Sequence, residues 1–142
     1  MRLLRSPAET LLLARMTFWA AVVPILKRVV PLPRLVRLFA TGCAGGRNPA
    51  REERVIASVV RIYRSGLIRQ GDNCLERSLV TYRYLGALHA DPQLVVGMSR
   101  REKGTGHVWV TVDGRPVHDT AETLDGMEPV VRFAADGSRL DA

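Results

Sequence analysis

A cysteine, a histidine and an aspartate lie in three segments whose residue types suit nucleophilic catalysis. Cys74 comes first, and the apolar residues after it recur at helical spacing: Leu75, Leu79, Tyr82 and Leu85. Asn73 is a good N-cap residue, and Glu76 stands where the carboxylate of a capping box would bond back to the cap. We therefore expect a helix to begin at Cys74, where the partial positive charge of the helix start favours the thiolate over the thiol.

The other two members of the constellation follow in a strand-like part of the chain. His107 begins a run in which valine takes every second position, a pattern typical of a β-strand, and Asp119 follows after an Asp-Gly turn. A cysteine hydrolase or acyl-transfer enzyme needs a thiolate, an imidazole close to it and a third group that orients the imidazole. Cys74, His107 and Asp119 are the residues we expect to fill these roles.

The turn between the two segments decides whether Asp119 can orient His107. A two-residue loop, Asp113-Gly114, would place Asp119 on the valine face of the hairpin, away from His107. A three-residue loop with Gly114 in the left-handed conformation would place Asp119 directly opposite His107. We expect the three-residue loop, and a two-residue loop would remove Asp119 as the orienting acid.

Other cysteines and histidines are weaker candidates. Cys43 lies in a glycine-containing loop without a helix start, and we interpret it as non-catalytic. His89 lies roughly 22 Å from the thiol along a straight helix, which makes it a poor general base.

Three residues near the predicted triad are candidates for binding the substrate: Asn73, Arg77 and Trp109. The backbone N–H of Cys74 is the natural first oxyanion donor. Gln70 or Asn73 could add a side-chain donor, but an Asn73 that caps the helix is already occupied. Arg77, one turn after Cys74, could receive a substrate carboxylate or carbonyl, and its alternative interpretation is a solvated helix residue.

The element order predicts an α+β fold in a single domain over residues 1–142. We expect a basic helical part over residues 1–70, with Ser6 as the first cap and Pro24 kinking or ending the first helix. The other expected helices cover 32–39, 50–65 and 74 to about 89. The expected strands cover 93–99, 107–112, 115–119 and 129–133, followed by a frayed tail, so that residues 71–133 hold the catalytic helix and a small antiparallel sheet.

Composition limits the classes of partner and cofactor. Residues 1–70 hold 13 Lys and Arg against 3 Asp and Glu, whereas residues 71–142 hold 8 against 11. A basic half could face an anionic membrane, an acidic peptide or protein, nucleic acid or only solvent. Aromatic residues make up only 6% of the chain and do not interleave with arginine, so nucleic acid is not expected.

The same composition bears on the compartment. Two cysteines make no disulfide framework, no Cys/His spacing suggests a metal, and we expect a cytoplasmic protein without a cofactor. The apolar stretch from Met16 to Leu26 is shorter than the roughly 20 residues that span a bilayer.

Three motifs resemble the transglutaminase-like peptidase of lasso-peptide biosynthesis, the B protein. They are Cys74-Leu75-Glu76-Arg77-Ser78-Leu79, the strand Leu94-Val95-Val96-Gly97-Met98, and the run from His107-Val108-Trp109-Val110 through Asp113-Gly114 to Asp119. The resemblance covers about residues 8–133. Family members often have Ala-His-Ala-Trp where this chain has Gly106-His107-Val108-Trp109.

The resemblance implies a core similar to that of papain and transglutaminases, with Cys74, His107 and Asp119 as the triad. It also implies removal of the leader from a ribosomal precursor peptide, whose core then passes to a macrolactam synthetase. Because residues 1–70 lack a hairpin pattern, we expect the stand-alone peptidase half, which needs a separate leader-recognition protein. The basic, apolar N-terminal half is then a dock for that protein, for the synthetase, or for peripheral contact with a membrane.

Two alternatives stay open. The same triad would serve an acyltransferase or transglutaminase, because only the acceptor differs from that of a hydrolase. The chain could also be a non-catalytic adaptor for the precursor peptide.

Overall fold

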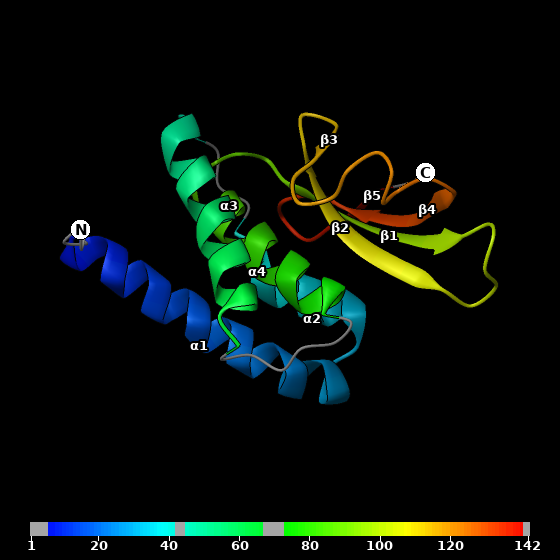
Figure 1. The fold of residues 1–142 in the computed structure, drawn as a ribbon, viewed down its shortest axis with the longest axis horizontal. Coiled ribbons are helices and arrows are strands. Elements are labelled where there is room, and N and C mark those ends of the chain that lie inside the picture. The colour runs from blue at the N-terminus through cyan, green and yellow to red at the C-terminus, as the bar shows by residue number, and fades with distance from the viewer. Residues whose placement is uncertain (1–5, 42–44, 67–72, 141–142) are drawn as a thin grey trace.

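The computed structural model describes residues 6–41, 45–66 and 73–140. Four helices come first: α1 (Pro7–Val29), α2 (Leu32–Phe39), α3 (Pro49–Arg64) and α4 (Cys74–Ala87). Five strands follow: β1 (Gln93–Ser99), β2 (Gly106–Val112), β3 (Arg115–Pro116), β4 (Met127–Phe133) and β5 (Arg139–Leu140). The predicted α+β class is confirmed, with the helices on one side of the molecule and the sheet on the other (Figure 1).

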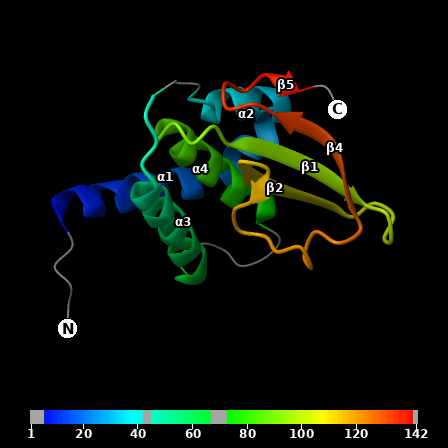
Figure 2. The ribbon, with the colours of Figure 1, turned by 90° about the horizontal axis from the view of Figure 1, so that it is seen from above.

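The strands form one antiparallel sheet in the order β3-β2-β1-β4-β5. Helix α4 is central, because it contacts α1, α2 and α3 as well as β1 and β2. Figure 2 shows α4 between the sheet and the outer helices. The valine face of β2 belongs to the core, as expected: Val108 and Val110 are buried with Leu79 of α4.

The first helix begins as predicted, but of the two effects expected from Pro24, ending the helix is wrong. Ser6 caps it as expected, since its side chain accepts a hydrogen bond from the backbone of Glu9. Pro24 does not end the helix, which continues to Val29. At 23 residues, α1 is by length and composition alone able to cross a membrane, although a signal sequence or a core helix would meet the same criteria.

The C-terminal tail is not frayed over its described part, contrary to prediction. After β4 the chain turns at Gly137, with a φ of 84°, and β5 pairs back onto β4. The hydroxyl of Tyr82 on α4 donates to the carbonyl of Ala134, which holds this turn against the helices. The sequence hides this strand because it is only two residues long.

Candidate active site

Helix α4 begins at Cys74, as predicted, but its cap is not the predicted one. Asn73 has a ψ of 24°, outside the extended range of a capping residue, and its side chain makes no capping bond. Glu76 does not reach back to Asn73 either; it is buried and forms an ion pair with Lys27 of α1. The capping-box prediction is therefore wrong, and the side-chain amide of Asn73 is not occupied by the helix.

Cys74 packs partly buried against the hydrophobic core. Cys74 is the first residue of a 14-residue helix, where the backbone N–H groups of the first turn point out of the helix start. Such N–H groups are the donors that an oxyanion would need.

The hairpin after β2 has the two-residue loop, so the three-residue prediction is wrong. Val112 pairs with Arg115, and both loop residues have positive φ, 53° at Asp113 and 75° at Gly114. These values are those of a type I′ turn, which matches the twist of the flanking strands. Arg47 also holds Asp113, at 2.7 Å, from the segment before α3.

A two-residue loop was expected to place Asp119 away from His107, but the two side chains are in contact. β3 ends at Pro116, and the chain bends at Val117 and His118, so that the ladder no longer sets the direction of Asp119. Nε2 of His107 lies 2.8 Å from Oδ1 of Asp119. Both side chains are largely buried, with 17% and 5% of their surfaces exposed.

This contact fixes the protonation pattern of the ring. A carboxylate only accepts, so Nε2 of His107 carries the hydrogen and donates it to Asp119. The lone pair of a neutral ring is then on Nδ1, the nitrogen that would take a proton from a thiol.

One buried hydrogen bond joins the thiol-bearing helix to the histidine-bearing strand. The hydroxyl of Ser78 donates to the backbone carbonyl of Val108 over 2.9 Å. Ser78 lies one helical turn after Cys74, and Val108 is the neighbour of His107. The bond therefore anchors the first turn of α4 to the residue next to the imidazole.

The geometry can now be compared with known proteins. A family model described as the transglutaminase-like superfamily matches residues 19–132, which is most of the chain. This protein belongs to the transglutaminase-like superfamily. No curated protein and no solved structure matches the chain. Members of this superfamily typically use cysteine-based catalysis.

In this transglutaminase-like domain, Arg77 of α4 lies close to Asp119. Its Nη2 lies 3.9 Å from Oδ1 of Asp119, and its Nε is buried without a partner among the described residues. The guanidinium therefore stabilises the negative charge of Asp119, and binding of a substrate group by Arg77 stays a prediction.

His118 lies near Arg77 and Asp119 and forms a hydrogen bond with Thr81. The hydroxyl of Thr81 donates to the backbone carbonyl of Arg77 at 2.8 Å, so Nε2 of His118, at 2.9 Å, donates to the same hydroxyl. Burial, and then the charge of Arg77, lower the pKa of His118 to about 4 against an opposing effect of Asp119. His118 is thus a neutral hydrogen-bond donor at physiological pH.

Trp109 lies against the ring of His107 and is itself buried. Its ring centroid is 5.9 Å from that of His107, with the two planes 21° apart. The indole also covers Gly97 of β1, where a Cβ would come within 2.6 Å of the ring. The glycine in the apolar strand β1 therefore has a structural reason, because Gly97 makes room for Trp109, which packs against the ring of His107.

A second cluster of polar side chains lies at the start of α4, and the sequence did not predict it. Its members are Lys27, Tyr63, Glu76 and Arg77. Lys27 neutralises Glu76 from α1, and Tyr63 of α3 comes close enough that Glu76 raises its pKa and Arg77 lowers it, with burial raising it most. Three of these atoms lack partners among the described residues: the Tyr63 hydroxyl, Oε2 of Glu76 and Nε of Arg77. No spacing in the sequence links residues so far apart.

The remaining predicted residues are placed as follows. Cys43 and Gln70 lie outside the described residues. His89 lies just beyond α4, with a φ of 62°, and its ring packs against Gly45. Over the described part of the chain, no group of three His, Cys, Asp or Glu side chains could hold a metal ion.

Proposed function

We propose that this protein is a cysteine peptidase that removes the leader from a ribosomally made precursor peptide of the lasso type. The observation that carries the proposal is the buried contact between His107 and Asp119, joined through Ser78 to the helix that begins with Cys74. The transglutaminase-like superfamily is compatible with this activity. The choice of precursor rests on the resemblance of the three motifs.

The proposed reaction runs in two steps. Nδ1 of His107 takes the proton of the Cys74 thiol, and the sulfur attacks the carbonyl carbon of the last leader residue. The C–N bond breaks, His107 gives its proton to the leaving amine of the core peptide, and the leader stays on Cys74 as a thioester. Water that gives its proton to His107 then attacks the thioester, which releases the leader acid and restores the thiol.

The residues around the triad support these steps. Asp119 holds the ring of His107 and stabilises the imidazolium that forms during attack, while Trp109 keeps its plane fixed. The backbone N–H of Cys74 and the uncommitted amide of Asn73 are the proposed oxyanion donors. Arg77 is the proposed contact for a substrate carbonyl or carboxylate.

The proposal includes partners and a compartment. A separate leader-recognition protein presents the precursor, and a macrolactam synthetase takes the released core amine. The reaction takes place in the cytoplasm, where precursor peptides are made.

Intact-mass spectrometry tests the proposal directly. The protein, the precursor and the leader-recognition protein are mixed, with wild type compared against Cys74→Ala. The proposal predicts two fragments whose masses sum to precursor plus water, with wild type alone. An uncut precursor with both proteins would contradict it.

Acyl transfer is the second candidate, because the superfamily also fits acyltransferases. The thioester on Cys74 would then be attacked by an amine in place of water. The same experiment with an added amine separates the two: a leader fragment that carries the amine shows transfer, and a leader acid shows hydrolysis.

A further inference from the structure

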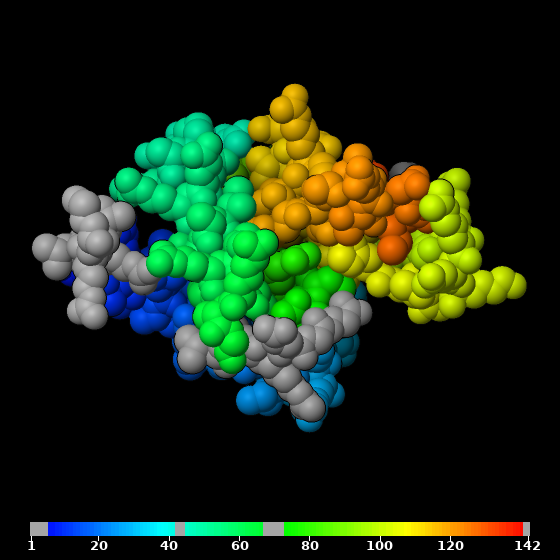
Figure 3. Space-filling model, viewed as in Figure 1, coloured from blue at the N-terminus to red at the C-terminus, as the bar shows by residue number. Residues whose placement is uncertain are grey.

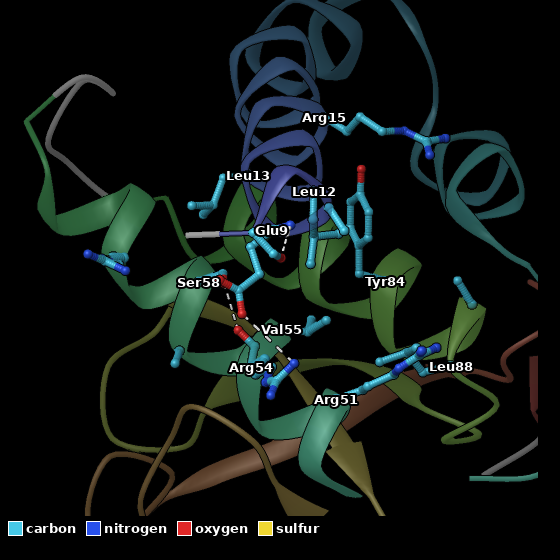
Figure 4. Close-up of a pocket in the computed structure, with 15 residues that line it drawn as sticks. Glu9, Leu12, Leu13, Arg15, Arg51, Arg54, Val55, Ser58, Tyr84 and Leu88 are labelled. Atoms are coloured by element: carbon cyan, nitrogen blue, oxygen red, sulfur yellow. Dashed lines mark hydrogen bonds and ion pairs between the residues drawn. The ribbon is translucent and has the colours of Figure 1, made fainter. Parts of the chain in front are cut away.

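A groove of about 620 Å³ opens at the end of α4 that is remote from Cys74. It lies between α1 and α3, with the last turn of α4 behind it (Figure 4). Tyr84 and Leu88 line it, and they follow Cys74 by 10 and 14 residues, so the groove lies roughly 15–21 Å from the thiol along the helix. Its size is typical of ligand-binding pockets.

The floor of the groove is apolar. Leu12 and Leu13 of α1, Val55 of α3, and Tyr84 and Leu88 of α4 contribute to its lining. In Figure 4, Leu12 and Tyr84 lie side by side near the centre of the groove. Such a floor favours the burial of large apolar side chains from a ligand.

The rim of the groove is basic. Arg51, Arg54 and Arg61 recur at helical spacing along one face of α3, and Arg15 stands on α1. Among the described residues of the lining, Glu9 is the one that is acidic, and it lies 3.8 Å from Arg54. Within residues 6–41, 45–66 and 73–140, no carboxylate forms an ion pair with the other three arginines.

We propose that this groove is a docking site for an acidic peptide segment that carries large apolar side chains. The arginine fork matches the geometry of a carboxylate, and the aliphatic floor receives the apolar side chains between the carboxylates. The proposed site is an exosite, because it binds the peptide segment at the opposite end of α4 from Cys74. Binding of the peptide at this groove does not depend on whether the Cys74 thiol is a nucleophile.

The shape and chemistry of the groove favour a peptide over other anionic partners. A flat lipid surface cannot fill a recess between three helices, whereas protruding side chains can. Single-stranded nucleic acid needs aromatic surfaces on which bases stack, and Tyr84 is the lone aromatic residue in the lining.

Fluorescence anisotropy with a synthetic probe tests the proposal. The probe is a labelled peptide of about twelve residues in which glutamate alternates with leucine and phenylalanine. Two control peptides replace either the glutamates by lysine or the apolar residues by serine. The protein carries Cys74→Ala, so that cleavage of the probe cannot affect the signal. We expect saturable binding of the probe and at least tenfold weaker binding of both controls, since about 1.4 kcal/mol accounts for each factor of ten.

Two variants test the two parts of the groove, and one is a matched control. Arg61→Glu reverses one charge of the rim, and Ala57→Trp fills the groove without changing its charge. Arg64→Glu makes the same reversal on α3 outside the groove. We expect the first two proteins to lose at least tenfold in affinity and Arg64→Glu to stay within twofold, with circular dichroism confirming that all three fold.

Other outcomes would overturn the proposal. Equal losses in the rim variant and in Arg64→Glu would show adhesion to a basic surface and not to the groove. Binding to vesicles that contain phosphatidylserine, without competition from the probe, would favour a membrane. A dimer in sedimentation that Ala57→Trp dissociates, with no probe binding, would make a second copy of this chain the occupant.

Discussion

Charged side chains are buried and paired at one end of helix α4, whereas at the other end they are exposed. At the Cys74 end, buried carboxylates are held by cations, as with Glu76 and Lys27 or Asp119 and Arg77. At the Leu88 end, arginines stand in solvent around an apolar groove (Figure 4). In Figure 3, α3 forms much of the visible surface between the N-terminal helix and the sheet. Buried, paired charges fix reactive atoms in place, whereas exposed and unpaired charges remain available to a partner.

The largest effect that would separate the two ends is expected from Asp119→Asn. The amide can no longer hold the proton-bearing nitrogen of His107 as the carboxylate does, so we expect the cleavage rate to fall by about 10³-fold. Binding of the acidic probe at the groove should not change. Single-turnover cleavage and probe anisotropy measure the two.

Asp125→Asn is the matched control for this change. Asp125 is exposed and pairs with Arg101 on the surface, so its loss should leave the cleavage rate unchanged. Full activity of Asp119→Asn would remove Asp119 from the catalytic residues.

The second prediction concerns the support beneath the imidazole. A methyl group at Gly97 would lie 2.6 Å from the indole of Trp109, so we expect Gly97→Ala to lower the free energy of unfolding by about 3 kcal/mol. Gly106→Ala is the control, since its nearest neighbour lies at 3.4 Å. Denaturant unfolding measures the free energy of unfolding of both variants. Equal values would contradict close packing of Trp109 against Gly97.

A third comparison removes one ion pair near each end of α4: Lys27–Glu76 near its start, and Glu9–Arg54, between α1 and α3, near its other end. Lys27→Met leaves the buried carboxylate of Glu76 without its cation, and we expect a loss of about 2 kcal/mol because Lys27 itself is partly exposed. Glu9→Gln removes an exposed pair at the groove and should cost under about 0.5 kcal/mol. Similar losses from thermal or denaturant unfolding would contradict the contrast between the two ends.

The smallest predicted effect is a dependence of stability on pH through His118. Its pKa is about 4 in the folded protein, below the ordinary 6.5, because of burial and then Arg77. Between these values the unfolded chain binds more protons, so the contribution is complete above pH 6.5 and is lost as pH falls toward 4. We expect wild type to lose about 1–2 kcal/mol more than His118→Gln between pH 7 and pH 4.5. Parallel losses in both proteins would exclude His118 as the cause.

Much of the fold was predictable from local pattern. The helical spacing after Cys74 and the valine alternation in β2 are both confirmed, because each element has one face in the core. The family match over residues 19–132 agrees with the order of helices and strands.

The parts that failed depend on contacts between distant residues. Glu76 has the spacing of a capping box, but Lys27 of α1 binds it instead. The Asp113-Gly114 turn follows its own preference for positive φ, and a bend after Pro116 still brings Asp119 to His107. Register arguments hold only as long as the ladder continues, and here it ends after two residues.

If Cys74 and His107 work as a pair, the imidazole must change the rate at which the Cys74 thiol is alkylated. Wild type and His107→Ala are treated with iodoacetamide from pH 5 to 9, and peptide mapping follows Cys74 separately from Cys43. The account predicts that Cys74 of wild type reacts at pH 6 at least about tenfold faster than Cys74 of His107→Ala, because the imidazole takes the thiol proton. Equal rates in the two proteins across this range would contradict the account.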